Sequence, residues 1–138
     1  MILENIHCLL QFDDRGNLLA LVSKSSGRNY IVKDGCSLFR LTMTEIIKNR
    51  VMPGTLALTG DMAEQIDFIQ QSQCLEIDYR NLDGMPVTVK CTIGFMDEEI
   101  HWNILIENKT RFAVSEIEYP VLLFKPYLGF NADSERIL

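Results

Sequence analysis

Residues 98–123 decide the fold. They read Glu-Glu-Ile-His-Trp-Asn-Ile-Leu-Ile-Glu, then Asn-Lys-Thr-Arg-Phe-Ala, then Val-Ser-Glu-Ile-Glu-Tyr-Pro-Val-Leu-Leu. Apolar side chains recur at every second position, first at Ile100, Trp102, Ile104 and Ile106 and then at Ile117, Tyr119 and Val121. Only Leu105 interrupts the polar face of the first run. Because successive side chains of a strand point to opposite faces, this alternation predicts two strands of an antiparallel sheet packed over a core.

Similar patterns occupy much of the remaining chain. Residues 7–24 predict a hairpin around a polar turn that contains Gly16, and residues 29–33 predict a third short strand before the Asp34-Gly35 turn. Alternation over 39–44 predicts another strand. In the second half, residues 75–79 and 87–95 alternate on either side of a turn centred on Asp83-Gly84, and a further turn at 96–98 leads into the Trp102 strand. Residues 73–121 therefore predict a meander of four strands.

Residues 45–72 indicate their secondary structure less clearly. The stretch 45–52 fits a helical turn or a strand. Pro53-Gly54 interrupts regular secondary structure, and 56–58 fits a short strand. Asp61 and Glu64 have the spacing of a capping box, which favours a short helix. A strand through 66–70 is the alternative, and we favour it because the neighbouring segments are all β.

The length and composition predict one domain. A chain of 138 residues with 47% apolar side chains can bury a core, and it shows no linker or repeat. Many short strands with frequent turns predict an all-β, antiparallel β-sandwich with little or no helix, because a single sheet would leave its apolar face wet. Residues 122–138 are expected to be a C-terminal tail or the start of a linker to a missing domain. Their apolar part, 122–130, must pack on this domain, on another domain or on another chain.

Net charge argues against two classes of partner. The formal charge is -6, whereas nucleic acids and anionic membrane surfaces require clustered Lys and Arg. No stretch is long and apolar enough to span a bilayer, and the N-terminus does not resemble a signal peptide, so a cytoplasmic location is expected. Four widely spaced cysteines without a CxxC pair predict free thiols rather than a zinc site.

Candidate chemical groups are sparse. Glu116 and Glu118 lie two apart on one predicted strand face, as a catalytic carboxylate pair would require, but solvated strand-face charges are far commoner. His7 and His101 are isolated, whereas a metal site needs three or four converging ligands. Trp102 is in register with three isoleucines, which favours a core position over an exposed sugar-stacking one. We therefore expect no catalytic, cofactor-binding or metal-ligating residue and no cofactor.

Three stretches together resemble a known class of domain: residues 14–31, residues 101–110 and residues 114–122. The first resembles a gly-x-leu, strand, thr-gly-arg-x-tyr opening. The other two resemble a trp-x-ile-x-ile-x-asn segment followed by ile-glu-phe-pro-x-leu. Both are typical of N-terminal β-domains of glycoside hydrolase-like proteins, which look like galactose-mutarotase-type supersandwiches. Such domains precede a (β/α)₈ barrel that carries the catalytic carboxylates, so the resemblance assigns no catalytic residue to positions 1–138.

Three functions follow as hypotheses. The first, implied by the resemblance, is a non-catalytic accessory domain that packs on or shapes a carbohydrate-active barrel. A stand-alone carbohydrate-binding module is the second, and it would need exposed aromatic residues such as Tyr30, Tyr79 or Tyr127. The third is a protein-interaction sandwich, including a homo-oligomer, that uses the apolar tail or an edge strand.

Overall fold

The computed structural model describes residues 1–32, 36–52 and 54–125, and these form three antiparallel sheets. The largest has the strand order β10-β9-β8-β7, a second has the order β1-β2-β3, and the third has the order β11-β4-β5, with β6 also paired to β4. The all-β prediction is confirmed. In chain order the elements are β1 (Ile2–Glu4), β2 (Cys8–Phe12), β3 (Leu18–Ser23), β4 (Arg40–Ile47), β5 (Arg50–Val51), β6 (Leu56–Thr59), the 3-10 turn η1 (Gly60–Met62), β7 (Ala63–Gln71), β8 (Cys74–Leu82), β9 (Val87–Met96), β10 (Glu99–Asn108) and β11 (Phe112–Glu118).

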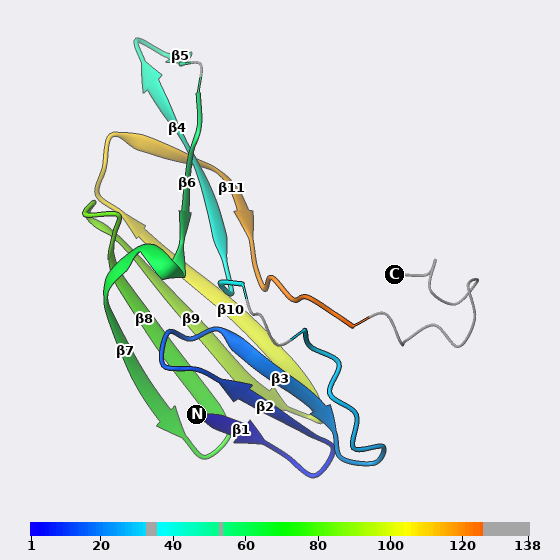
Figure 1. The fold of residues 1–138 in the computed structure, drawn as a ribbon. Coiled ribbons are helices and arrows are strands. Elements are labelled where there is room, and N and C mark those ends of the chain that lie inside the picture. The colour runs from blue at the N-terminus through cyan, green and yellow to red at the C-terminus, as the bar shows by residue number, and fades with distance from the viewer. Residues whose placement is uncertain (33–35, 53, 126–138) are drawn as a thin grey trace, which may run out of the picture.

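One core joins the three sheets. The inner face of the large sheet is apolar at every second position. The buried residues of β8 and β9 that follow this alternation are Leu75, Ile77, Tyr79, Val87, Val89, Cys91 and Ile93. Buried residues of the two smaller sheets belong to the same cluster, among them Leu10 on β2 and Leu41 on β4. The two smaller sheets thus form a divided second layer over the large one, in a sandwich-like arrangement (Figure 1).

Tight turns follow from residues that adopt positive φ. Asp97 and Glu98 have φ of 50° and 67°, and they join β9 to β10 as the two central residues of a hairpin. Lys48 and Asn49, with φ of 51° and 63°, do the same between β4 and β5. Positive φ at both central residues matches the right-handed twist of the flanking strands, so both hairpins close tightly.

The prediction that residues 73–121 form a four-stranded meander is wrong about which strands belong to it. Strands β7 to β10 form the four-stranded meander, and β11 leaves it to pair with β4. Asn108 redirects the chain after β10, because its side-chain amide donates to the Phe112 carbonyl at 2.7 Å and its side-chain carbonyl accepts the Thr110 N–H at 3.0 Å. Alternation alone cannot name a strand's partner, which explains the error.

Two further predictions need correction. Of the expected strand at 29–33, residues 29–32 are described, and they form only isolated bridges at Asn29 and Ile31. The Asn29 side chain accepts the N–H groups of Leu21 and Ile31 at 3.0 and 3.1 Å. Ile117 was expected on the core face, but it follows a bulge on the edge strand β11 and is 48% exposed. The Asp34-Gly35 turn lies outside the described residues.

The less decisive region 45–72 is mostly strand. Residues 45–47 extend β4, β5 and β6 follow, and the segment beyond η1 is the nine-residue strand β7, as favoured. At the other end, the start of the predicted tail packs on its own domain: Val32 N–H donates to the Leu123 carbonyl, and Lys125 N–H donates to the Tyr30 carbonyl, both at 2.8 Å. Residues 126–138 lie outside the described part of the chain.

Candidate functional site

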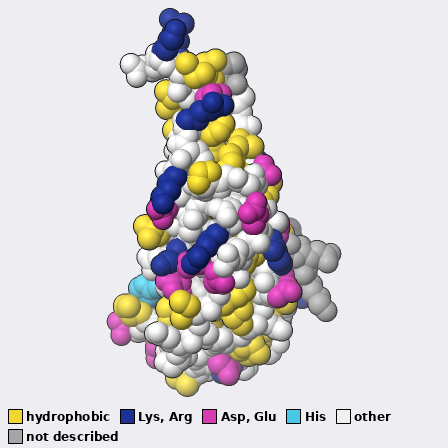
Figure 2. Space-filling view, turned by 90° about the vertical axis from the view of Figure 1, so that its left-hand side faces the viewer, with side chains coloured by type: hydrophobic (Ala, Val, Ile, Leu, Met, Phe, Trp, Pro, Cys, Tyr) yellow, Lys and Arg dark blue, Asp and Glu magenta, His cyan; other side chains and the backbone are white. Residues whose placement is uncertain are grey.

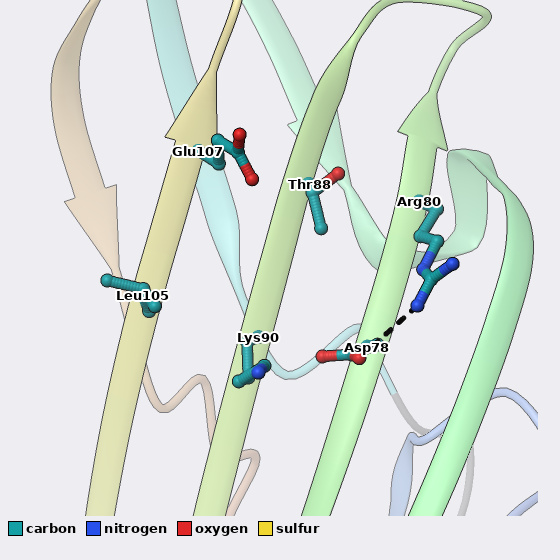
Figure 3. Close-up of a pocket in the computed structure, with 6 residues that line it drawn as sticks. All are labelled: Asp78, Arg80, Thr88, Lys90, Leu105 and Glu107. Carbon is teal, nitrogen blue, oxygen red and sulfur yellow. Dashed lines mark ion pairs between the residues drawn. The ribbon is translucent and has the colours of Figure 1, made fainter.

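A shallow hollow lies on the outer face of the large sheet. It measures about 340 Å³ and draws on three adjacent strands (Figure 3). These residues alternate with the core residues of the same strands, so the sheet places them on the side away from the core. The lining residues are Asp78 and Arg80 on β8, Thr88 and Lys90 on β9, and Leu105 and Glu107 on β10.

Charge pairing in this hollow is weak. Asp67 and Asp78 stand directly opposite each other on β7 and β8, and Arg80 lies between them, 3.8 Å from a carboxylate oxygen of each. Lys90 pairs with Glu76 at 3.3 Å. Partly exposed pairs of this kind contribute about 0–1 kcal/mol each. None of the described lining residues is aromatic, so they offer no platform on which a sugar ring could stack.

A second pocket lies where the third sheet meets η1. It measures about 260 Å³ and collects residues from three separate segments of the chain. Arg40, at the start of β4, stands between Thr59 of β6 and Glu118 of β11 in the strand ladder. The full lining, which we call the junction pocket, is Cys36, Ser37, Phe39, Arg40, Thr59, Asp61, Glu118 and Val121.

The two glutamates of the candidate carboxylate pair have different surroundings. Glu116 and Glu118 are both exposed on β11, but only Glu118 lines the junction pocket. The two histidines each contact one of two consecutive glutamates: His7 lies 3.3 Å from Glu98, and His101 lies 3.4 Å from Glu99. Within residues 1–32, 36–52 and 54–125, no three His, Cys, Asp or Glu side chains are grouped as a metal site would require.

Aromatic residues mostly serve the core. Trp102 packs against the core with its ring edge-on to Tyr119, at a centroid distance of 6.3 Å, which confirms the expected position. Tyr79 is completely buried, so its suggested role as an exposed sugar platform is wrong. Tyr30 is half-buried, and Tyr127 lies outside the described residues.

Buried thiol and phenol groups are held in their neutral forms. The four cysteines are free, as predicted. Burial raises the pKa of the Cys91 thiol to about 12, although a hydrogen bond with Tyr119 acts in the opposite direction. Burial also raises the pKa values of Tyr79 and Tyr119. A nucleophilic cysteine needs a lowered pKa and access to solvent, so Cys91 has the character of a core residue.

Sequence reasoning did not find the junction pocket. Its residues come from segments at 36–40, 59–61 and 118–121, and no local motif links them. The alternation over 39–44 marked Arg40 only as one polar strand residue among several. Its convergence with Asp61 depends on how β4, β6 and β11 pair.

Comparisons with known proteins supply no identity. No protein-family model matches the chain, and no curated protein matches its sequence. Among the described residues there is no helix with the length and apolar character needed to cross a membrane.

Proposed function

We propose that this chain is a non-catalytic accessory β-sandwich domain that packs against another protein domain. The resemblance to front domains of glycoside hydrolase-like proteins suggests a carbohydrate-active barrel as that neighbour. Support from the structure comes from one feature, the β4–β5 hairpin, which we define as residues 45–52.

The hairpin exposes apolar side chains on both of its faces. Ile46 is 46% exposed, Ile47 is 44% exposed and Val51 is 68% exposed. Ile46 and Val51 are cross-strand partners, and Ile47 points to the opposite face of the hairpin. Strand β11 pairs with β4 only as far as Glu45, so it does not cover this end. The hairpin projects beyond the body of the domain in Figure 1.

Charged residues lie beside this apolar surface. Lys48 is at the turn and Arg50 follows on β5, and Figure 2 shows basic side chains at the projecting end above a patch of hydrophobic ones. Apolar surface gains about 25 cal/mol per Å² when it is removed from water, and contiguous exposed patches mark interaction sites. Burial of the apolar side chains of the hairpin under a neighbouring domain would therefore stabilise the association of the two domains.

Two measurements test this function. The first is hydrolysis of a panel of aryl glycosides, for which we expect no turnover. Turnover that disappears in Glu116→Gln or Glu118→Gln would refute the non-catalytic assignment. The second begins by sequencing the source DNA on either side of the coding segment. The aim is to find an adjacent barrel domain, which is the expected partner.

The partner experiment then uses that barrel domain, added to this protein, with hydrogen exchange read residue by residue. We expect the hairpin amides to become protected. The double variant Ile46→Ser/Val51→Thr should lose this protection, whereas Ile69→Ser, which alters an exposed isoleucine on β7, should retain it. Protection elsewhere with an unchanged hairpin would refute the proposed contact.

A further inference from the structure

The junction pocket brings one cation and two anions together without pairing them. Arg40 is directly opposite Glu118 in the β4–β11 ladder, and Asp61 enters from η1. Across the described residues, the Arg40 side chain makes no ion pair with either carboxylate and no hydrogen bond. Figure 1 shows why these groups converge: the lower ends of β4, β6 and β11 meet near η1.

Ser37 adds a buried donor to the pocket. It is 6% exposed, and its Oγ accepts the Gly60 N–H at 2.7 Å. A serine hydroxyl can also donate one hydrogen bond, and within the described chain no acceptor for that hydrogen is found. Because Ser37 lines the pocket, its hydroxyl hydrogen can be donated to a ligand there.

Apolar residues form part of the pocket wall. Phe39 is completely buried and sits edge-on to Tyr79, with ring centroids 4.9 Å apart. Its ring face is therefore not presented for stacking, and apolar surface for a small aliphatic group comes from the half-buried Val121. A ligand that relies on ring stacking, as sugars commonly do, is disfavoured here.

From this arrangement we infer that the junction pocket binds a small zwitterion, a free aliphatic α-amino acid. Arg40 and the Ser37 hydroxyl donate to its carboxylate, and Asp61 and Glu118 accept hydrogen bonds from its ammonium group. Charge-assisted hydrogen bonds of this kind are roughly twice as strong as neutral ones. A simple anion would be repelled by two carboxylates, and a simple cation would leave Arg40 without a partner. The inference does not depend on the accessory role, because the hairpin at 45–52 contributes nothing to this pocket.

Titration of the isotope-labelled protein followed by amide and arginine side-chain NMR tests the inference. The probes are glycine, L-alanine and L-valine. Ethylamine and propionate, each of which carries only one of the two charges, are the matched controls. We expect saturable shifts at Ser37, Arg40 and Thr59 with the amino acids, and affinities at least about tenfold lower for either half-molecule.

Three variants locate the binding groups. Arg40→Gln and Glu118→Gln should each weaken amino-acid binding by at least about tenfold. Glu116→Gln changes an exposed carboxylate on the same strand that does not line the pocket, so it should bind like the unchanged protein. Circular dichroism checks that all three fold alike.

Several results would overturn the inference. These are the absence of saturable shifts up to high millimolar amino acid, equal binding of ethylamine or propionate, or binding that Arg40→Gln leaves unaltered. Shifts at the same amides with glycerol or glucose, as large as those with alanine, would show a site for neutral polyols instead.

Discussion

The phenol of Tyr79 on β8 lies against the backbone of Gly16, and its hydroxyl donates a hydrogen bond to the Gly16 carbonyl at 3.4 Å. Gly16 belongs to the β2–β3 turn, so this contact joins two sheets from positions 63 residues apart. Gly60 approaches the same ring from η1, and a Cβ built there would lie 2.7 Å from a ring carbon. Tyr79 thus depends on two glycines that leave room for it.

Substitution of Gly16 should be strongly destabilising. Gly16 has a φ of 79°, and an added Cβ would collide with the Tyr79 hydroxyl. We expect Gly16→Ala to lower the free energy of unfolding by about 2–4 kcal/mol, since strain at positive φ and overpacking add. Gly27→Ala is the matched control: its φ is 72°, but nothing lies within 4 Å, so only about 1 kcal/mol should be lost. Urea unfolding compares the two, and equal losses would mean that the contact with Tyr79 is unimportant.

Arg15 should stabilise η1. Its Nη2 donates to the carbonyls of Gly60, Asp61 and Ala63 at 3.4, 2.9 and 3.2 Å. Hydrogen bonds from charged groups contribute about 1.5–3 kcal/mol to stability. Arg15→Ala should therefore lower the free energy of unfolding, measured by heat or urea, by roughly that amount. Arg111→Ala provides the comparison, because the Arg111 side chain is 77% exposed and, among the described residues, pairs with Glu45 and the Phe112 ring. A cost near zero for both would rule out the bracing role of Arg15.

Stability should decline at alkaline pH. In the unfolded chain Cys91 ionises near its ordinary pKa of 9.0, whereas in the folded protein its pKa is about 12. Between these values the unfolded state binds fewer protons, so the free energy of unfolding falls as pH rises, by up to about 1.4 kcal/mol per pH unit. Below pH 9 the Cys91 contribution is fully present. Urea unfolding of the unchanged protein and of Cys91→Ala should show a shallower pH dependence in the variant, and identical slopes would contradict this account.

Thiol alkylation followed by mass spectrometry provides a separate test of Cys91. The residue is completely buried, and only the thiolate is the nucleophile. At pH 8 the Cys91 peptide should stay unmodified in the folded protein and become modified in denaturant. Modification of Cys91 at the same rate in both states would show that the strand opens readily.

Hairpin substitutions should leave the fold intact. Because Ile46 and Val51 are exposed, Ile46→Ser/Val51→Thr should change the free energy of unfolding by about 0.5 kcal/mol or less per site. Leu41 is on the same strand as Ile46 but is completely buried, so Leu41→Ala should lower the free energy of unfolding by about 2–5 kcal/mol. Urea unfolding distinguishes the two classes. A large loss in the hairpin variant would mean that these side chains already pack within the domain.

Local alternation determined much of this protein. The inner positions of β8, β9 and β10 follow a period of two, and so do the polar positions that line the outer-face hollow. Polar turn residues were equally informative: Asp97 and Glu98 join β9 to β10 where the sequence predicted a turn. These features depend on residues close together in the chain, so single-sequence reasoning reaches them.

Strand partners and the junction pocket were decided only by the tertiary structure. The alternation at Ile117, Tyr119 and Val121 fits a place beside β10 as well as one beside β4, and the choice rests on hydrogen bonds and packing between distant segments. That choice sets Glu118 opposite Arg40, and the path of β6 and η1 then brings Asp61 to them. Side-chain alternation states which face a residue occupies, whereas the neighbour it meets there depends on long-range register, which no local pattern encodes.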